Sequence, residues 1–266
     1  MNRHVTRCAV VGVSTVLLLA SCANNDDQDE NAGAQEPAAA PITETEWFTE
    51  RFTSAPVLVA AATTNPQTFR PDNNQGGPLP DDAPEGSILW QSPACVTVPF
   101  TSDGPAESVL DNEGVLTLTG YDHTELGAAA AAIGLLSVSS ASADQTRATS
   151  VATGLPLAEA QRLVATSPAF GPDSARVRAA GEPCRNNDHR TTAYRVADMT
   201  DSYAVVDVFS PVSNNPGEGV TIRLSVEWTG DDWRLAPSSF DSLANSYEQY
   251  DPKQKATVDL AEFTQW

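Results

Sequence analysis

Residues 220–235 read VTIRLSVEWTGDDWRL, and this stretch decides the fold class. Apolar side chains occupy every second position from Val220 to Trp228, with polar side chains between them. A period of two is typical of a β-strand that buries one face. Gly230-Asp231 is a turn signal, and Trp233 and Leu235 alternate with polar neighbours again. The stretch therefore predicts an antiparallel hairpin at the end of a sheet.

Strand signals directly before this hairpin, and helix signals before those, extend the pattern. Residues 191–197 and 203–209 predict two more strands, and residues 126–143 contain no charged side chain and predict a buried helix. Further helices are predicted over 144–153, from Pro156 with Leu157, Ala160, Leu163 and Val164 on its inner face, and over 172–181. Helices followed by an antiparallel meander predict an α+β domain, with helices packed on one face of a curved sheet.

The part of this domain before the first helix is expected to be extended. Residues 88–119 contain three strand-like runs, and residues 120–124 read as a turn. Asp122, with Glu125 three residues later, fits a capping box at the start of the helix. The domain is therefore predicted to span residues 87–266.

Residues 22–86 are predicted to be a mostly disordered tether. Residues 23–46 contain seven acidic side chains and no Lys or Arg, which leaves too little apolar surface to offset the entropy of ordering. Within the tether, residues 42–62 allow two interpretations. Trp47, Phe48 and Phe52, followed by Val57-Leu58-Val59, indicate either a helix docked on the domain or an apolar linker.

The first 21 residues have the layout of an export signal. Arg3 and Arg7 precede an apolar run over residues 10–20, which is too short to span a bilayer, and small residues follow. The tetrapeptide Leu19-Ala20-Ser21-Cys22 resembles the lipobox of bacterial lipoproteins, in which the cysteine thiol is diacylated before cleavage. This predicts a palmitate-type anchor on Cys22 at the outer face of the cytoplasmic membrane. The alternative is an ordinary secretory signal that contains a cysteine.

Charge excludes one class of partner. The chain has 15 Lys and Arg against 35 Asp and Glu, a net charge of −20. Loss of residues 1–21 removes two arginines and no acidic residue, so the remaining chain is more acidic still. Nucleic acid and anionic lipid head groups repel such a chain, so we do not expect either to bind directly.

Two cysteines remain after lipidation of Cys22 and removal of Cys8. In an oxidising compartment Cys95 and Cys184 have one intramolecular pairing, so we predict a disulfide between them. Two separate buried thiols are the alternative, because sequence does not show proximity.

No catalytic, cofactor or metal site is predicted. His123 beside Asp122 is the one pair that fits general acid–base chemistry, but a ring bonded to backbone at the helix start is the favoured interpretation. The chain has no Gly-x-Ser-x-Gly elbow, and its His and Cys spacing matches no metal motif.

Aromatic residues in the strands allow a core or a pocket. Trp228 and Trp233 belong to a set that either fills the core, as we expect, or lines the mouth of the sheet. The rest of this set is Trp90, Tyr194, Tyr203 and Phe209. If Trp228 is buried, its replacement by Ala is expected to unfold the domain. Phe263 and Trp266 are expected to pack back on the domain or to form a partner surface.

Three segments resemble a family of actinobacterial envelope proteins that is associated with conjugative elements. They are residues 120–128, the hairpin 227–235 and the tail 259–266. The order of elements is also similar to cone-shaped folds of the nuclear-transport-factor-2-like type, and the family's domain resembles the periplasmic domain of the type IV secretion assembly factor. The chain departs from the family pattern at Glu125, where that pattern has proline.

This resemblance implies a non-catalytic lipoprotein that contacts other envelope proteins, in a conjugation or secretion assembly. A small-ligand carrier that uses the interior of the cone is the first alternative. A hydrolase or isomerase of the same fold, using Asp122 and His123, is the second.

Overall fold

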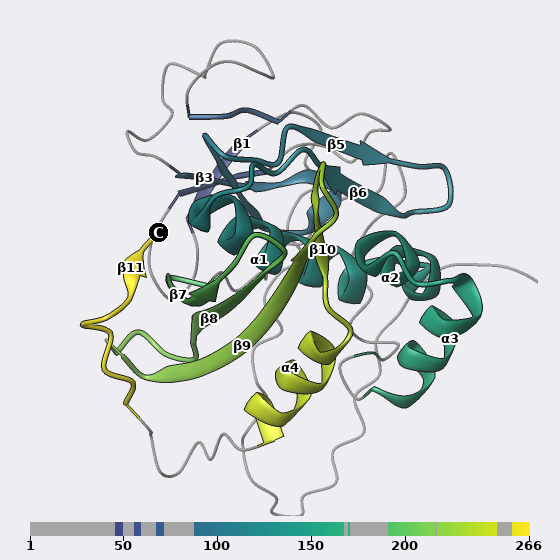
Figure 1. The fold of residues 1–266 in the computed structure, drawn as a ribbon. Helices are drawn as coiled ribbons and strands as arrows, with labels where there is room; N and C mark the ends of the chain where they lie inside the picture. Colours follow the sequence, from purple (N-terminus) through teal and green to yellow (C-terminus); the bar gives the residue numbers. More distant parts are fainter. Residues whose placement is uncertain are drawn as a thin grey trace, which may run out of the picture. The chain divides into compact units, whose positions relative to one another are not determined.

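The structure is a computed structural model that describes residues 46–49, 56–59, 68–71, 88–167, 170, 191–215, 217–248 and 257–266. The chain divides into two units, Met1–Pro37 and Ala38–Trp266, and every described residue belongs to the second. This unit combines α-helices with mostly antiparallel sheets, which confirms the predicted α+β class (Figure 1).

The predicted meander is a five-stranded antiparallel sheet in the order β10-β9-β8-β7-β11. Its long strands are β8 (Tyr203–Pro211) and β9 (Gly219–Trp228), which pair along their full lengths. The strands that flank this pair are β7 (Ala193–Met199), β10 (Trp233–Leu235) and β11 (Thr264–Gln265). The strands predicted over 191–197, 203–209 and 220–228 are therefore confirmed, whereas β11 has no counterpart in the prediction.

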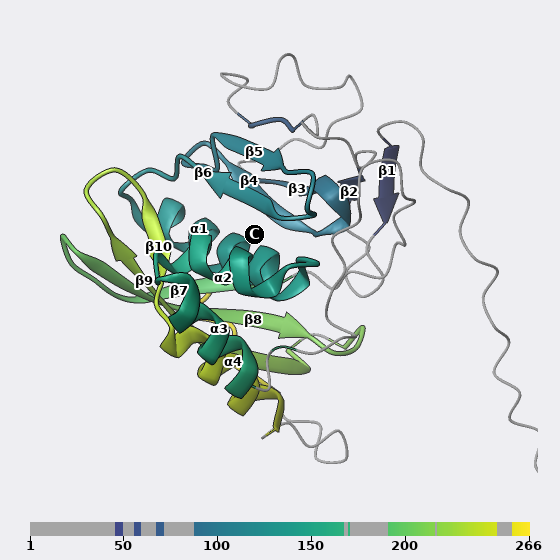
Figure 2. The ribbon, with the colours of Figure 1, turned by 90° about the vertical axis from the view of Figure 1, so that its right-hand side faces the viewer.

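Helix α1 (Glu125–Ala141) packs against one face of this sheet, and strand β4 lies on its other side (Figure 2). Five consecutive alanines, Ala128 to Ala132, are fully buried. Their small methyl side chains allow strands to pack against several sides of the helix. The sheet contributes alternate residues to this core, among them Val206, Ile222 and Leu224. The uncharged stretch thus becomes a helix buried all round, as predicted.

A second, four-stranded sheet has the order β1-β2-β3-β4. Its strands are β1 (Glu46–Thr49), β2 (Pro56–Val59), β3 (Ile88–Ser92) and β4 (Val98–Thr101), and only β2 and β3 run parallel. A short hairpin of β5 (Glu107–Leu110) and β6 (Leu116–Thr119) follows. Because β1 and β2 lie before residue 87, the folded domain reaches further toward the N-terminus than predicted. The docked helix considered for residues 42–62 was wrong, since the described residues of that range form these two strands.

Helix α2 (Gln145–Thr153) matches the predicted range 144–153 within one residue, and α3 (Leu157–Thr166) begins directly after Pro156, where a helix start was predicted. Asp144 caps α2 by accepting the Arg147 N–H at 3.0 Å, and Gly154 ends it in the left-handed region at φ 72°. The predicted inner face of α3 is partly wrong, since Leu157 is 57% exposed and only Ala160 is fully buried. The helix predicted over 172–181 lies outside the described residues.

Helix α4 (Ser238–Glu248) was not predicted, and it packs on β9. Its hydroxyl Ser239 Oγ donates to the carbonyl of Ser225 at 3.1 Å and accepts the N–H of the same residue at 2.9 Å. Three α4 residues share a hollow with Thr221 and Arg223, which alternate with the core residues of β9. Helices therefore pack on both faces of the five-stranded sheet, and the prediction of one face was wrong.

Cys95 ends a short 3-10 helix, η1 (Pro93–Cys95), and is buried. It is disulfide-bonded in the structure. Its predicted partner, Cys184, lies outside the described residues, so the pairing stays a prediction.

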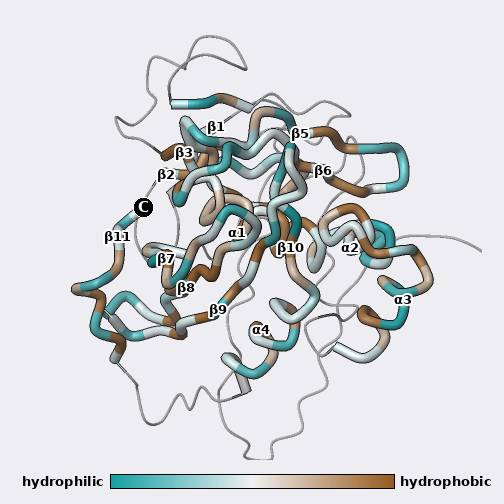
Figure 3. The backbone as a smooth tube through the Cα atoms, viewed as in Figure 1, coloured by the Kyte–Doolittle hydropathy of each residue, from teal (hydrophilic) through white to brown (hydrophobic). Residues whose placement is uncertain are grey.

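In the described part of the chain, no helix is both long enough and apolar enough to cross a membrane. Hydropathy along the chain places brown, apolar segments on the strands that face α1 (Figure 3).

Candidate functional site

Asp232 joins two sequence motifs, the segment 120–128 and the hairpin 227–235, by hydrogen bonds across 111 and 112 residues. Its carboxylate accepts the backbone N–H of Gly120 at 3.0 Å, that of Tyr121 at 3.1 Å and that of Trp233 at 2.9 Å. Asp232 is buried, so these three donors replace water around its charge. Burial, followed by the Asp232 charge, raises the pKa of the buried Tyr121 hydroxyl well above its ordinary value.

Trp233 makes the second connection between the motifs. Its ring is fully buried, and its Nε1–H donates to the carbonyl of Asp122 at 2.9 Å. That carbonyl also accepts the N–H of Thr124 at 2.9 Å. The hairpin β9–β10 therefore fixes the backbone at the position where α1 begins.

Two glycines of the 120–128 motif are required by this close approach. Gly120 has φ 78°, a left-handed conformation that side chains other than glycine rarely adopt. At Gly127, a Cβ atom would lie 2.1 Å from the carbonyl oxygen of Asp122. The motif thus encodes a tight turn packed on the first turn of α1.

The helix cap differs from the prediction. Thr124, not Asp122, is the N-cap of α1, and its Oγ1 accepts the N–H of Gly127 at 3.0 Å. The same hydroxyl donates to Asp103 Oδ2 at 2.5 Å. An N-cap residue directly precedes its helix, so capping by Asp122 requires a helix that begins at His123; α1 begins later, at Glu125, and the capping position falls on Thr124.

His123 and Trp228 remain at the surface after these internal contacts. The His123 ring stacks on the Trp228 indole, with centroids 4.5 Å apart and planes at 23°, and lies 5.2 Å from the Trp233 ring. His123 is exposed and Trp228 is partly buried. The predicted bond from the His123 ring to backbone is therefore wrong, because the ring's contacts in the described structure are with the two indoles.

The other aromatic residues divide between core and surface. Trp90 and Phe209 are buried, as Trp233 is, while Tyr203 is exposed and donates to Asp198 Oδ2 at 2.5 Å. Tyr194 is partly buried. The expectation of core positions is therefore confirmed for Trp90, Phe209 and Trp233, and it was wrong for Tyr203.

Trp266 packs back on the domain, as predicted. Its N–H donates to the carbonyl of Thr192 at 3.1 Å. Its ring lies 4.4 Å from that of Tyr194 and 5.6 Å, edge-on, from that of Trp90. The segment around β11 is thus held to β7 by an aromatic cluster as well as by strand pairing.

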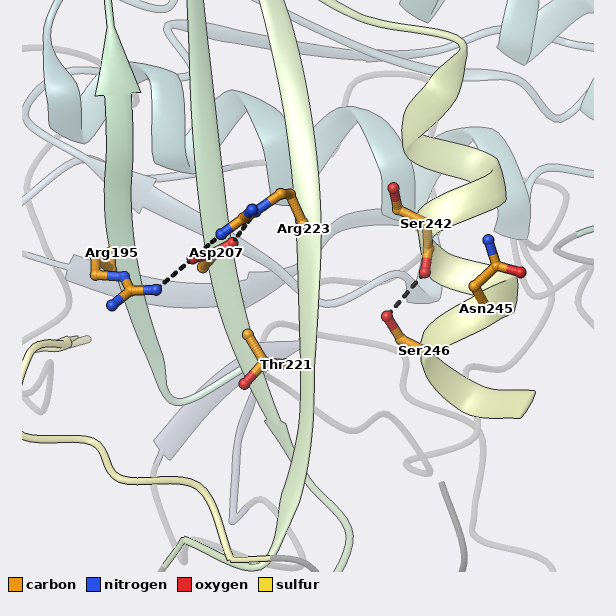
Figure 4. Close-up of a pocket in the computed structure, with 7 residues that line it drawn as sticks. All are labelled: Arg195, Asp207, Thr221, Arg223, Ser242, Asn245 and Ser246. Atoms are coloured by element: carbon orange, nitrogen blue, oxygen red, sulfur yellow. Dashed lines mark hydrogen bonds and ion pairs between the residues drawn. The ribbon is translucent and has the colours of Figure 1, made fainter. Parts of the chain in front are cut away.

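A second polar site lies on the outer face of the five-stranded sheet (Figure 4). Asp207 of β8 stands opposite Arg195 of β7 and opposite Arg223 of β9 in the strand register. Arg223 Nε and Nη2 donate to the two oxygens of Asp207 at 2.7 and 2.9 Å, and Arg195 Nη2 donates at 2.6 Å. Sequence reasoning missed this row of Arg195, Asp207 and Arg223 across three strands. The position of Arg223 between buried residues of β9 already indicated that it lies on the outer face.

Electrostatics at this row favour the charged carboxylate. Burial raises the pKa of Asp207, but the hydrogen bonds and charges of Arg223 and Arg195 outweigh it, and the pKa is lowered from its ordinary value. Arg195 also pairs with Glu262 at 2.5 Å and lies over the Phe263 ring at 5.1 Å. Bonding to Asp207 raises the pKa of both guanidinium groups.

Potential metal ligands are not clustered in the described part of the chain. The described residues contain no group of three or more His, Cys, Asp or Glu side chains placed to hold a metal ion. Asp122 and His123, the pair considered for acid–base chemistry, are both exposed. The structure brings His123 next to Trp228 and Trp233, so three of the predicted site residues do form one cluster.

Comparison with curated proteins and with solved structures found no significant match. Comparison with protein-family profiles matched one family, described as a domain of unknown function, DUF8175, over residues 53–264. That range covers more than half of the chain and includes the whole of both motifs, residues 120–128 and 227–235. The chain therefore belongs to the DUF8175 family.

Proposed function

We propose that the protein is a lipoprotein of the bacterial cell envelope, carried on the outer face of the cytoplasmic membrane by lipid on Cys22. The three-part signal in residues 1–21 and the Leu19–Cys22 tetrapeptide support this proposal. Two acyl chains give a stable anchor, whereas one is marginal. A disulfide at Cys95 agrees with an oxidising compartment.

The Cys22→Ser variant is expected to lose its lipid and to keep its signal segment. Cells grown with labelled palmitate should label the parent chain, and the variant should show no label and an uncleaved signal. Cys8→Ser is the matched control, because it changes a thiol inside the signal and should keep both label and cleavage. Label on the Cys22→Ser chain would contradict the proposed anchor.

The anchored domain, we infer, acts by contacting other envelope proteins rather than by catalysis. The observation that carries this is the exposed His123–Trp228 stack, set on a frame in which Asp232 and Trp233 are buried and fully bonded. Partly exposed tryptophan on a rigid support is typical of the residues that dominate binding energy at interfaces. Catalytic use of Asp122 and His123 is the weaker alternative, since the ring stacks on indole and has no acidic hydrogen-bond partner among the described residues.

The partners we propose are components of a conjugation or secretion assembly. Support comes from the likeness of residues 120–128, 227–235 and 259–266 to envelope proteins of conjugative elements. The antiparallel meander that follows α1 to α3 supports a cone-shaped, nuclear-transport-factor-2-like fold for the domain. The net charge of −20 favours basic partner surfaces over acidic ones.

A photo-crosslinking residue in place of His123 is expected to capture the same envelope components in living cells on each repeat. The matched control places it at Arg162, an exposed residue of α3 whose side chain is 76% accessible. Trp228→Ala should reduce capture from position 123 about tenfold, because removal of an interface anchor costs more than 1 kcal/mol. Equal capture from both positions, or capture of unrelated abundant proteins, would contradict the proposed contact surface.

A further inference from the structure

A polar hollow between β9 and α4 contains unused hydrogen-bond donors. It has a volume of about 390 Å³ and is lined by polar side chains only (Figure 4). Arg195, Asp207, Thr221 and Arg223 come from the sheet, and Ser242, Asn245 and Ser246 come from α4. The volume lies near the lower end of the range for small-molecule sites, so a small polar group fits better than a large apolar one.

The charges in the hollow do not cancel. Asp207 is 2% exposed, and both of its oxygens are already occupied by guanidinium donors. Arg195 has a second acidic partner in Glu262, outside the hollow. Arg223 shares the Asp207 carboxylate with Arg195, and its own side chain is 61% exposed. Within the lining itself two guanidinium groups therefore stand against one carboxylate, in a chain whose net charge is −20.

Several donors near Arg223 have no hydrogen-bond partner within the described part of the chain. Arg223 Nη1 makes no bond there, and neither do the hydroxyls of Thr221 and Ser242 or the amide of Asn245. Thr221 and Arg223 are two apart on β9, and Ser242 and Asn245 are three apart on α4, so each pair shares one side of its element. Such donors around an exposed guanidinium match a group of acceptor oxygens that carries negative charge.

We propose that this hollow binds an oxyanion, a carboxylate or phosphate group, on the free edge of Arg223. Thr221, Ser242 and Asn245 donate to its remaining oxygens. Asp207 holds the guanidinium plane in place, because a bidentate pair fixes both position and orientation. The site lies on the outer face of the sheet, and it is separate from the His123–Trp228 stack.

Titration of the full chain with citrate and with inorganic phosphate tests this proposal. The readout is the NMR signal of the arginine Nε–H groups, followed at constant ionic strength kept with NaCl. We expect a saturable shift of the Arg223 signal in the parent chain, and about tenfold weaker binding in Arg223→Gln, measured there on the Arg195 signal. Arg162→Gln is the matched control, because Arg162 is exposed on α3, pairs with Glu159 at 3.6 Å and should leave binding unchanged when replaced.

A second variant separates binding from folding. Thr221→Val combined with Asn245→Ala removes two donors and leaves the pairs of Asp207 intact, so the domain should stay folded and bind more weakly. Saturation by citrate alone assigns a carboxylate, and saturation by both ions assigns a general oxyanion site. A shift that does not saturate, or equal affinity in the parent chain and both variants, would overturn the proposal.

Discussion

Trp233→Ala is expected to lower the free energy of unfolding by about 3–5 kcal/mol, the usual cost of deleting a fully buried large aromatic side chain. The Trp233 ring is 0% exposed, so its removal leaves a cavity beside α1. The change also breaks the 2.9 Å bond from Nε1 to the Asp122 carbonyl, which couples the hairpin to the start of α1. Since a domain is stable by only about 5–15 kcal/mol, we expect marginal folding or none.

Guanidinium unfolding, followed by far-UV circular dichroism, measures this effect. Trp228→Ala is the control, because it removes the same side chain from the same hairpin at a partly exposed site, and its effect should be smaller. Trp233→Phe keeps most of the volume and loses the hydrogen bond, so it should fall between the parent chain and Trp233→Ala. Equal loss in Trp228→Ala and Trp233→Ala would show that burial does not distinguish the two residues.

Much of the secondary structure could be predicted, because each element has a local signal. The alternation in β9 and the uncharged alanine run of α1 are periodic over many residues, and each identifies its element without reference to the rest of the chain. Asp144 and Gly154 bound α2 by capping rules that also act within one turn.

Elements that depend on distant partners were missed. Strands β1 and β2 have four residues each. β1 pairs with β2, and β2 pairs with β3, which lies beyond a segment rich in Asn, Gln, Pro and Gly. Helix α4 was missed for a related reason. Phe240 is its fully buried anchor, and the neighbouring residues are mostly polar. Such elements are ordered by tertiary contacts that override weak local preference.

The candidate site was predicted in pieces. His123, Trp228 and Trp233 were named from sequence, but their contacts follow from the way Asp232 seats the hairpin on residues 120–121. The sequence places Asp232 in a turn, where a solvated carboxylate is ordinary. Its burial becomes visible only when the two motifs are brought together in space.

Replacing both Arg195 and Arg223 by Met is expected to destabilise the domain by about 3–5 kcal/mol at pH 7, because the buried Asp207 carboxylate then has no counter-ion. Methionine keeps an apolar stem over the sheet, so most of the loss comes from the unpaired charge. In the parent chain the arginines lower the pKa of Asp207 below its ordinary value, 3.8. In the double variant burial acts alone, and the pKa lies above that value.

The two chains therefore respond to acid in opposite ways. In the parent chain the folded state binds the Asp207 proton less readily than the unfolded state, so this stabilisation is complete above about pH 4 and is lost as the pH falls through the folded pKa. In the double variant the folded state binds the proton more readily, so acid relieves the cost. Denaturant unfolding at pH 7 and at pH 3 should show that the difference in unfolding free energy between the two chains shrinks with acid.

Adding Asp207→Asn to the double variant removes the buried charge and should restore part of the stability at pH 7, although the contacts of Arg195 with Glu262 and Phe263 stay lost. A triple variant no more stable than the double would mean that the charge of Asp207 does not need its arginines.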